Sequence, residues 1–331
     1  MTMSVSGRRQ SAILFPLMAA ALFAAVPAAA LAQADFPNRP IRIVVPLVPG
    51  GTSDLLPRMV GEKLTARWGQ PVIVENKPGG ALHLGTEAVA RAAPDGYTLL
   101  LAPQGPLVLS PSLYRKLSYD PAAFVPVTVL ARLPYVFVAN PKVPASSVPD
   151  LIVFAKANPD RLNFGTPGTG SAQHLAVEWF KILTGVRLTH VPYRGTAPAI
   201  ADLLAGHVEL MFDNAANALP QVRDGRLKAL AIGAPPRIPE LPDVPAMAEF
   251  FPGFLAASWF AIVAPPRTPA DIAAKLSQAL AETLRMPDIA HRLHGLGATP
   301  GGSSPDETAA FLRQETERWR KVIVDSGIRL E

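Results

Sequence analysis

Two glycine-bearing turns hold the residues whose types and spacing best suit the binding of an anion. Each turn follows an apolar run and leads into an amphipathic segment. A strand, a glycine turn and a helix start place free backbone N–H groups and the positive end of a helix dipole around one point. We therefore expect both turns to contact a carboxylate, through Gly50, Gly51, Thr52, Ser53 and Asp54 in the first and Thr166, Gly170, Ser171, Gln173 and His174 in the second.

Pro57 indicates where the first of these helices begins. With Asp54 as the N-cap, Pro57 is the third helical residue and costs no hydrogen bond. A cap at Ser53 would instead put the proline where an N–H group is needed. We therefore predict that Asp54 caps the helix and that the Ser53 side chain faces the ligand.

The remaining candidates are polar residues that begin a predicted helix or end a predicted strand: His83, Gln104, Arg194, Gly195, Thr196 and Asp213. Arg194 could bind a distal carboxylate through two N–H groups, and a solvated ion pair is its alternative role. Asp213 and Gln104 lie at the carboxyl ends of strands, where parallel sheets bind ligands. His83 either tunes the polarity of the site or is exposed to solvent.

Catalytic interpretations of the second turn are weaker. Gly165 and Gly170 have the spacing of a phosphate-binding loop, but Ser171 stands where the lysine should be, so we predict no nucleotide site. Ser171 and His174 suggest a hydrolase, yet no G-x-S-x-G motif is present, and a histidine in the same helical turn suits a neighbour of the cap. We predict no catalytic residue, no cofactor and no metal. An extracytoplasmic hydrolase using Ser171 and His174 stays the alternative.

The elements that position these residues alternate between strands and helices. β-branched runs of this kind are typical of strands buried on both faces of a parallel sheet. A proline-rich stretch from Pro103 to about Pro134 separates two such series, and we expect a doubly wound α/β sheet in each. Predicted strands span 41–45, 72–75, 97–102, 135–139, 162–164, 188–191, 208–212, 227–232 and 259–264. Predicted helices include 83–91, 148–157, 196–205, 269–285, 287–294 and 305–326.

The N-terminal segment indicates secretion. Arg8 and Arg9 precede an apolar, alanine-rich run from Ala12 to Leu31, which ends in small-x-small cleavage sites. This order predicts a cleaved signal peptide over 1–34, with a transmembrane helix as the alternative. The 331-residue chain is 49% hydrophobic and has no cysteine, which favours a periplasmic globular protein without disulfides. The net charge of +5 has no long basic cluster, so nucleic acid is not an expected partner.

A series of short motifs runs in a fixed order along nearly the whole predicted mature chain. They are Phe36-Pro37-Asn38-Arg39-Pro40-Ile41, Val45-Pro46, Pro49-Gly50-Gly51, Asp54, Glu75-Asn76-Lys77-Pro78-Gly79, Pro94-Asp95-Gly96-Tyr97-Thr98-Leu99, His190-Val191-Pro192-Tyr193-Arg194-Gly195, Asp202-Leu203-Leu204-Ala205-Gly206, Met211-Phe212-Asp213, Gly225-Arg226-Leu227-Lys228-Ala229-Leu230-Ala231 and Glu315 to Trp319. Together they resemble the extracytoplasmic substrate-binding receptors of tripartite tricarboxylate transporters, the Bug family.

The resemblance implies a two-lobed periplasmic binding protein, type II-like and of the Venus flytrap kind, with lobe 1 at 35–136 plus 260–331 and lobe 2 at 137–259. It implies a monomer that captures a dicarboxylate, tricarboxylate or aromatic acid and delivers it to integral-membrane transporter subunits. A sensor that signals the presence of the ligand is a further alternative. The chain departs from the family pattern at residues 80–85, where Ala-Gly-Gly-Asn-Ile-Gly is usual, and at Leu47, where an aromatic residue is common.

Overall fold

The computed structural model describes residues 36–50 and 52–330. The chain divides into two compact units, Met1–Asn38 and Arg39–Glu331, and the second holds every helix and strand of the described residues. The predicted signal peptide, 1–34, lies outside the described residues. Within the described ranges, no helix is long and apolar enough to cross a membrane.

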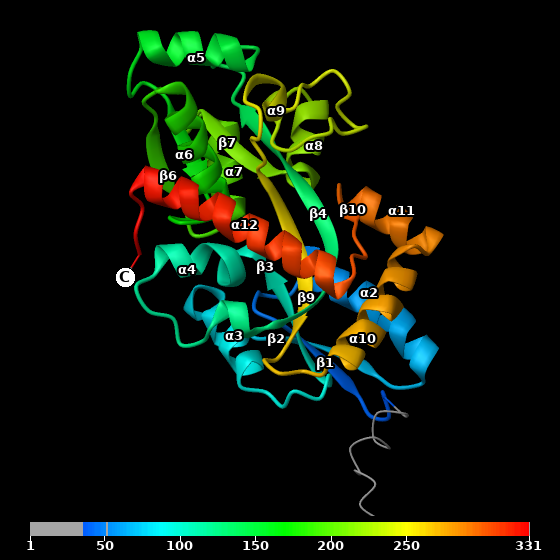
Figure 1. Ribbon diagram of the computed structural model, residues 1–331. Coiled ribbons are helices and arrows are strands. Elements are labelled where there is room, and N and C mark those ends of the chain that lie inside the picture. Colours follow the sequence, from blue (N-terminus) through cyan, green and yellow to red (C-terminus); the bar gives the residue numbers. More distant parts are fainter. Residues whose placement is uncertain (1–35, 51, 331) are drawn as a thin grey trace, which may run out of the picture. The chain divides into compact units, whose positions relative to one another are not determined.

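A first parallel block forms one end of the sheet (Figure 1). Its central strand pairs in parallel with a neighbour on each side, and Ile43 lies opposite Val74 and Leu99. The central and third strands are apolar on both faces and almost wholly buried, as the β-branched run predicts. The block consists of β1 (Ile41–Val45), α2 (Thr52–Trp68), β2 (Val72–Asn76), α3 (His83–Ala90) and β3 (Thr98–Pro103).

A second parallel block forms the other end of the sheet. In its central strand the buried Phe164 lies opposite His190 on one neighbour and Leu210 on the other. Its elements are α5 (Val148–Ala157), β5 (Asn163–Thr166), α6 (Ala172–Thr184), β6 (Thr189–Pro192), α7 (Thr196–Ala205) and β7 (Leu210–Asn214). The predicted strands and helices of both blocks are confirmed to within about two residues.

Two antiparallel strands in the middle of the sheet join the blocks. β9 (Ala257–Ala264) pairs with β3 and with the first part of β4 (Val125–Ala139), while the last part of β4 pairs with β7 and with β8 (Lys228–Ile232). The predicted strand at 135–139 is thus only the end of a longer one, which begins within the proline-rich stretch. Pro126 lies at a bulge and Pro134 at the last pair with β9, where a missing donor costs little.

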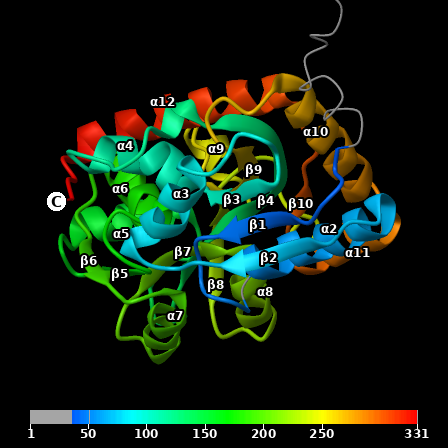
Figure 2. The same cartoon turned by 90° about the horizontal axis from the view of Figure 1, so that it is seen from below.

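Helices cover both faces of the sheet. Figure 2 shows α2, α10 and α11 grouped beside the first block. Seven short elements of the described residues were not predicted, at 80–82, 105–109, 110–113, 121–123, 215–223, 247–250 and 299–300. Those at 105–109 and 215–223 contain prolines that disfavour a helix in the sequence pattern. The remaining elements are η1 (Gly80–Leu82), η2 (Gly105–Leu109), α4 (Ser110–Leu113), η3 (Pro121–Ala123), α8 (Ala215–Arg223), α9 (Met247–Phe250), α10 (Ala270–Leu284), α11 (Pro287–Gly295), β10 (Thr299–Pro300) and α12 (Pro305–Ser326).

Helix α12 contacts both blocks, because it packs against α10, β4, η2 and α6 (Figure 1). Its start matches the prediction: the Ser304 hydroxyl accepts from the Glu307 N–H group, and the Glu307 carboxylate accepts from the Ser304 N–H group. Further along, the buried Glu315 carboxylate accepts from the indole N–H groups of Trp259, at 2.8 Å, and Trp319, at 3.3 Å. The bond from Trp259 ties α12 to the crossing strand β9, and the bond from Trp319 lies within α12.

The architecture confirms the predicted α/β class with a doubly wound block at each end of one mixed sheet. The proposed lobe boundaries, 136/137 and 259/260, fall within β4 and β9 and stay a prediction. Strand β9 pairs with β3 of the first block and with β4, and β4 in turn pairs with β7 of the second block.

Replacing Trp319 tests the contribution of α12. Trp319 is fully buried, so Trp319→Ala should lower the free energy of unfolding by about 3 to 5 kcal/mol through lost burial and a residual cavity. Urea denaturation measures this loss. The matched control is Val324→Ala on the same helix, because Val324 is 56% exposed and should change stability by less than about 0.5 kcal/mol. Equal losses in the two variants would contradict the assignment.

Candidate functional site

A cavity of about 460 Å3 lies where the carboxyl ends of β3 and β5 face each other across the central strands. Parallel α/β sheets bind their ligands at this end of the strands. Five sequence-predicted residues line it: Gln104, Gly170, Ser171, Gln173 and Thr196. None of the described residues in its lining is an aspartate, glutamate, lysine or arginine.

The loop between β5 and α6 presents unused hydrogen-bond donors to this cavity. The backbone N–H groups of Thr169, Ala172 and Gln173 donate to no protein acceptor in the part of the chain that the structure describes. All three residues line the cavity, and Ala172 and Gln173 begin α6, where no intrahelical acceptor exists. The dipole of α6, a 13-residue helix, adds positive potential at the same place. The arrangement suits an anion.

The remaining N–H groups of the loop are used to hold its shape. The Gly170 N–H group donates to His174 Nδ1 at 3.1 Å, and the Ser171 N–H group donates to the Gly168 carbonyl at 3.2 Å. The Ser171 hydroxyl caps α6 by accepting from the His174 N–H group at 3.2 Å. Internal bonds therefore decide which donors of the loop stay available.

Two stacked imidazole rings, those of His174 and His190, form hydrogen bonds with residues of this loop. The His174 and His190 rings lie 3.8 Å apart at 12°, and His190 Nε2 is 2.7 Å from the hydroxyl of Thr166 at the end of β5. Burial lowers the pKa of His174 to about 3 and that of His190 to about 4. Both rings are therefore neutral near pH 7, and the unprotonated Nδ1 of His174 can accept the Gly170 N–H group.

The same geometry bears on the hydrolase alternative. A general base must lie within hydrogen-bond reach of the proton that it removes. The His174 ring instead engages Gly170 through Nδ1, and its Nε2 lies 3.7 Å from a carboxylate oxygen of Glu178. The contact between Ser171 and His174 uses the His174 backbone, so the imidazole does not activate the hydroxyl in this arrangement.

In the first glycine turn, a carboxylate of the protein itself accepts the Gly50 N–H group. Asp54 accepts from the Gly50 N–H group at 3.2 Å and from the Arg58 guanidinium at 2.9 and 3.1 Å. Hydrogen bonding by Arg58 holds the pKa of the Asp54 carboxyl below its usual range. Gly50, Thr52, Ser53 and Asp54 lie outside the lining of the cavity, and Gly51 lies outside the described residues.

The predicted N-cap at Asp54 was wrong. Helix α2 begins at Thr52, so Asp54 lies in its first turn and Pro57 lies inside the helix. The carboxylate serves Gly50, before the helix, and Arg58, one turn further along, instead of the N–H groups of the helix start. Ser53 is buried, although it does not reach the cavity.

Polar residues at the crossing strands form the floor of the cavity. Gln104 is buried after β3 and donates through Nε2 to the Tyr135 hydroxyl at 3.4 Å, while its Oε1 has no partner among the described residues. Asp213, on β7, accepts hydrogen bonds from the Asn214 N–H group and from the side-chain amide of Asn217. Burial raises the pKa of Asp213 to about 7. The carboxyl group accepts hydrogen bonds from one backbone donor and one amide donor, and it does not line the cavity.

The other candidates are placed around the cavity without lining it. His83 Nε2 lies 3.0 Å from the hydroxyl of Ser110, which does line it, and burial lowers the His83 pKa. Thr166 and His174 support the loop from within, as described above. Arg194 is exposed, and its neighbour Gly195 precedes α7 at a positive φ of 112°.

An apolar wall faces the donors of the β5–α6 loop. Its residues come from distant parts of the chain, so the sequence pattern singled out few of them: Leu47, Leu82, Leu109, Leu113, Tyr114, Phe260 and Leu330. The wall closely approaches Gly170, where an added Cβ would lie 2.8 Å from Leu330 Cδ1. Gly170 also has a φ of +76°, so both the close approach and the backbone require glycine there. The only sequence signals for this wall were Leu47 and the altered 80–85 segment.

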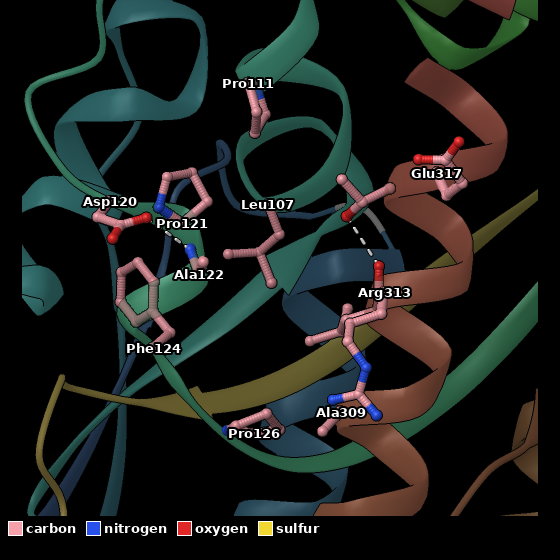
Figure 3. A pocket seen from close by; sticks show the side chains of 12 residues that line it. Leu107, Pro111, Asp120, Pro121, Ala122, Phe124, Pro126, Ala309, Arg313 and Glu317 are labelled. Carbon is pink, nitrogen blue, oxygen red and sulfur yellow. Dashed lines mark hydrogen bonds between the residues drawn. The ribbon is translucent and has the colours of Figure 1, made fainter. Parts of the chain in front are cut away.

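Size alone does not identify the site, because a hollow of about 490 Å3 lies between α12 and the 107–126 segment (Figure 3). Its charged residues, Asp120, Arg313 and Glu317, stand on its rim and do not converge in the view of Figure 3. It also lacks the converging strand ends and helix starts of the first cavity. No group of three His, Cys, Asp or Glu side chains able to hold a metal occurs among the described residues.

Comparisons with known proteins agree with this geometry. The family model "Tripartite tricarboxylate transporter family receptor" matches residues 56–328. Protein BugT of Bordetella pertussis is 38% identical over 307 residues, 92% of this chain and 94% of BugT. The structure of Rhodopseudomonas palustris Rpa4515 with adipate has a TM-score of 0.79 at 37% identity, over 89% of this chain and 99% of that one. MatC of the same organism with bound malate has a TM-score of 0.75 at 34% identity, over 87% of this chain and all of that one.

The fold and the cavity define a two-lobed solute-binding protein of the periplasmic type. The chain belongs to the tripartite tricarboxylate transporter receptor family, which includes the Bug proteins. The resemblance inferred from the motifs is therefore confirmed. Its relatives are solute-binding proteins, not enzymes.

Asp213→Asn should change how stability depends on pH. The pKa of Asp213 in the folded state, about 7, lies above its ordinary value of 3.8. In the wild type, the stabilisation of the fold that results from this shift is fully present below pH 4 and is lost as the pH rises through 7. Asparagine keeps the Oδ1 acceptor that serves both Asn214 and Asn217. The stability of the variant relative to wild type should rise by on the order of a few kcal/mol between pH 4 and 8. Urea denaturation at both pH values measures this; a pH-independent difference would contradict it.

Proposed function

We propose that the chain is a periplasmic receptor that captures a small carboxylated organic acid between its two blocks and performs no chemistry on it. The observation that carries the proposal is the set of unused N–H groups at Thr169, Ala172 and Gln173, which face a cavity without charged side chains. A carboxylate there would satisfy these donors, and each such bond to a charged group contributes about 1.5 to 3 kcal/mol. Adipate and malate, bound by two relatives, belong to the same chemical class.

Closure about the crossing strands would complete the site. The donors come from the second block and the apolar wall mostly from the first, so a bound acid would contact both. Because a ligand shifts a conformational equilibrium only by its differential affinity, an acid that bridges both blocks favours the closed arrangement. We propose that integral-membrane transporter subunits recognise this closed form and accept the acid from it.

The donor set can be tested with one substitution that removes an N–H group and little else. Ala172 is the first residue of α6, a position that proline tolerates, and Ser171 has φ −64° and ψ 156°, which suits a residue before proline. Ala172→Pro should therefore keep the fold and weaken the binding of a carboxylate by about ten- to a hundredfold. Isothermal titration of ligand-stripped protein with hexanoate, adipate, benzoate, malate and citrate measures the affinities.

The control is Ala172→Ser, which keeps the N–H group and adds bulk at the same place. It should bind the same acid within about threefold of wild type, since no donor is lost. Equal affinities of wild type and Ala172→Pro would remove this N–H group from the site. If none of the five acids bound the stripped wild-type protein, the proposal of a carboxylate receptor would fail.

A further inference from the structure

A second cavity, of about 470 Å3, lies on the other face of the crossing strands β4 and β9. Successive side chains of a strand point to opposite faces of a sheet. On β9, Phe260 lines the first cavity, Trp259 lines the second, and Ser258 lines both. On β4, Tyr135 lines the first cavity and Arg132 lines the second. We call the second one the Trp259 cavity.

The walls of the Trp259 cavity are mainly aromatic side chains and prolines. The rings of Trp259 and Phe311 lie 5.3 Å apart in an edge-to-face arrangement, at 73°. The segment after β8 adds Pro235, Pro236 and Pro239 to the lining. Concave sites of this size, mostly apolar and with a few polar groups, are typical of sites for small molecules.

Arginine side chains give this apolar cavity a positive charge. The charged residues in its lining are Arg132, Arg237, Arg318 and Glu315. Arg237 is neutralised by Glu249, which lies outside the lining and accepts two hydrogen bonds from it, at 2.7 and 2.8 Å. Arg132 and Arg318 therefore share the cavity with a single carboxylate, that of Glu315.

Glu315 is already engaged and cannot neutralise both arginines. Its Oε2 accepts from the indoles of Trp259 and Trp319, and its Oε1 forms an ion pair with Arg318. The Arg318 side chain is only 21% exposed, and its Nε donates to no acceptor in the part of the chain that the structure describes. Burial lowers the pKa of Arg318 to about 10, so the guanidinium is still charged near pH 7.

Arg132 is the cation of this cavity that has no carboxylate partner among the described residues. Its guanidinium lies 4.8 Å from the centroid of the Phe311 ring, and it is exposed to solvent. A guanidinium presents a planar set of N–H donors that matches the two oxygens of a carboxylate. The cavity thus combines an unpaired guanidinium with an aromatic wall in direct contact with it.

We propose that the Trp259 cavity is a second ligand site of this receptor, and that it binds an aromatic carboxylate. The carboxylate pairs with Arg132, and the aryl body packs against Trp259, Phe311 and the prolines. The first cavity has no charged residue in its described lining and offers backbone N–H groups instead, so the two sites recognise an acid by different means. Only Ser258 lines both cavities, and the inference does not depend on the proposed function.

A crystal structure of the mature protein with 6-bromo-2-naphthoate locates the site, because the anomalous signal of bromine marks each bound molecule. We expect bromine in the Trp259 cavity and a carboxylate oxygen within hydrogen-bond distance of the Arg132 guanidinium. Occupancy of the first cavity as well would bear on the proposed function and not on this inference. Bromine in the first cavity alone, elsewhere on the protein, or nowhere would overturn it.

Arg132→Gln tests whether the site binds in solution. The side chain is exposed and pairs with no carboxylate, so the variant should keep the fold. Isothermal titration with 2-naphthoate should show binding to this cavity weakened by about three- to tenfold, between the effects of an exposed and a buried charged bond. The loss should be the same in wild-type protein and in Ala172→Pro, because the two sites are separate.

Arg313→Gln is the matched control, since it removes an exposed arginine of α12 that lies outside this lining. It should leave the affinity for 2-naphthoate within about twofold of wild type. The uncharged 2-naphthamide should bind the wild-type cavity at least about threefold more weakly than 2-naphthoate. Equal affinities in Arg132→Gln and Arg313→Gln, or equal binding of the acid and the amide, would contradict the proposed carboxylate site.

Discussion

The loop that lines the candidate site is held in shape by the hydrogen bond from the Gly170 N–H group to His174 Nδ1. This bond exists because burial keeps the imidazole neutral, and because His190 and Thr166 hold the ring in place by stacking and hydrogen bonding. With Gly170 engaged internally, the loop turns so that Thr169, Ala172 and Gln173 present their N–H groups to the cavity. The histidine that suggested a hydrolase thus supports the backbone that would bind the anion.

A second constraint is that the cavity is assembled from both blocks of one sheet. Strand β9 joins β3 of the first block to β4, β4 joins β9 to β7 of the second block, and α12 packs against elements of both blocks. The hydrogen bond from the Trp259 indole to Glu315 fastens that helix to β9. The strands and helices that carry the donors and the apolar wall are therefore connected to one another, although the residues lie far apart in the sequence.

Local patterns predicted most of the fold and five of the residues that line the candidate site. Strand 41–45 and helix 305–326 were predicted with their observed bounds, because an unbroken β-branched run and a capping box are local signals. The first ten residues of β4 were missed, since tolerance of Pro126 and Pro134 depends on the bulge and the partner strand. The wall residue Leu330 could not be predicted, because only the folded chain brings it to Leu113 and Gly170.

The two glycine turns show where a motif stops being informative. Both have the strand, turn and helix that create an anion site, and only the structure reveals that Asp54 accepts the Gly50 N–H group of the first. Whether an N–H group stays free depends on whether a side chain of the folded protein accepts its hydrogen bond, and the tertiary structure determines this. The most direct measurement is therefore a crystal structure of the mature protein with hexanoate bound. The structure described here predicts carboxylate oxygens within hydrogen-bond distance of the Thr169, Ala172 and Gln173 nitrogens; a carboxylate bound instead at Gly50 to Ser53 or in the hollow beside α12 would contradict it.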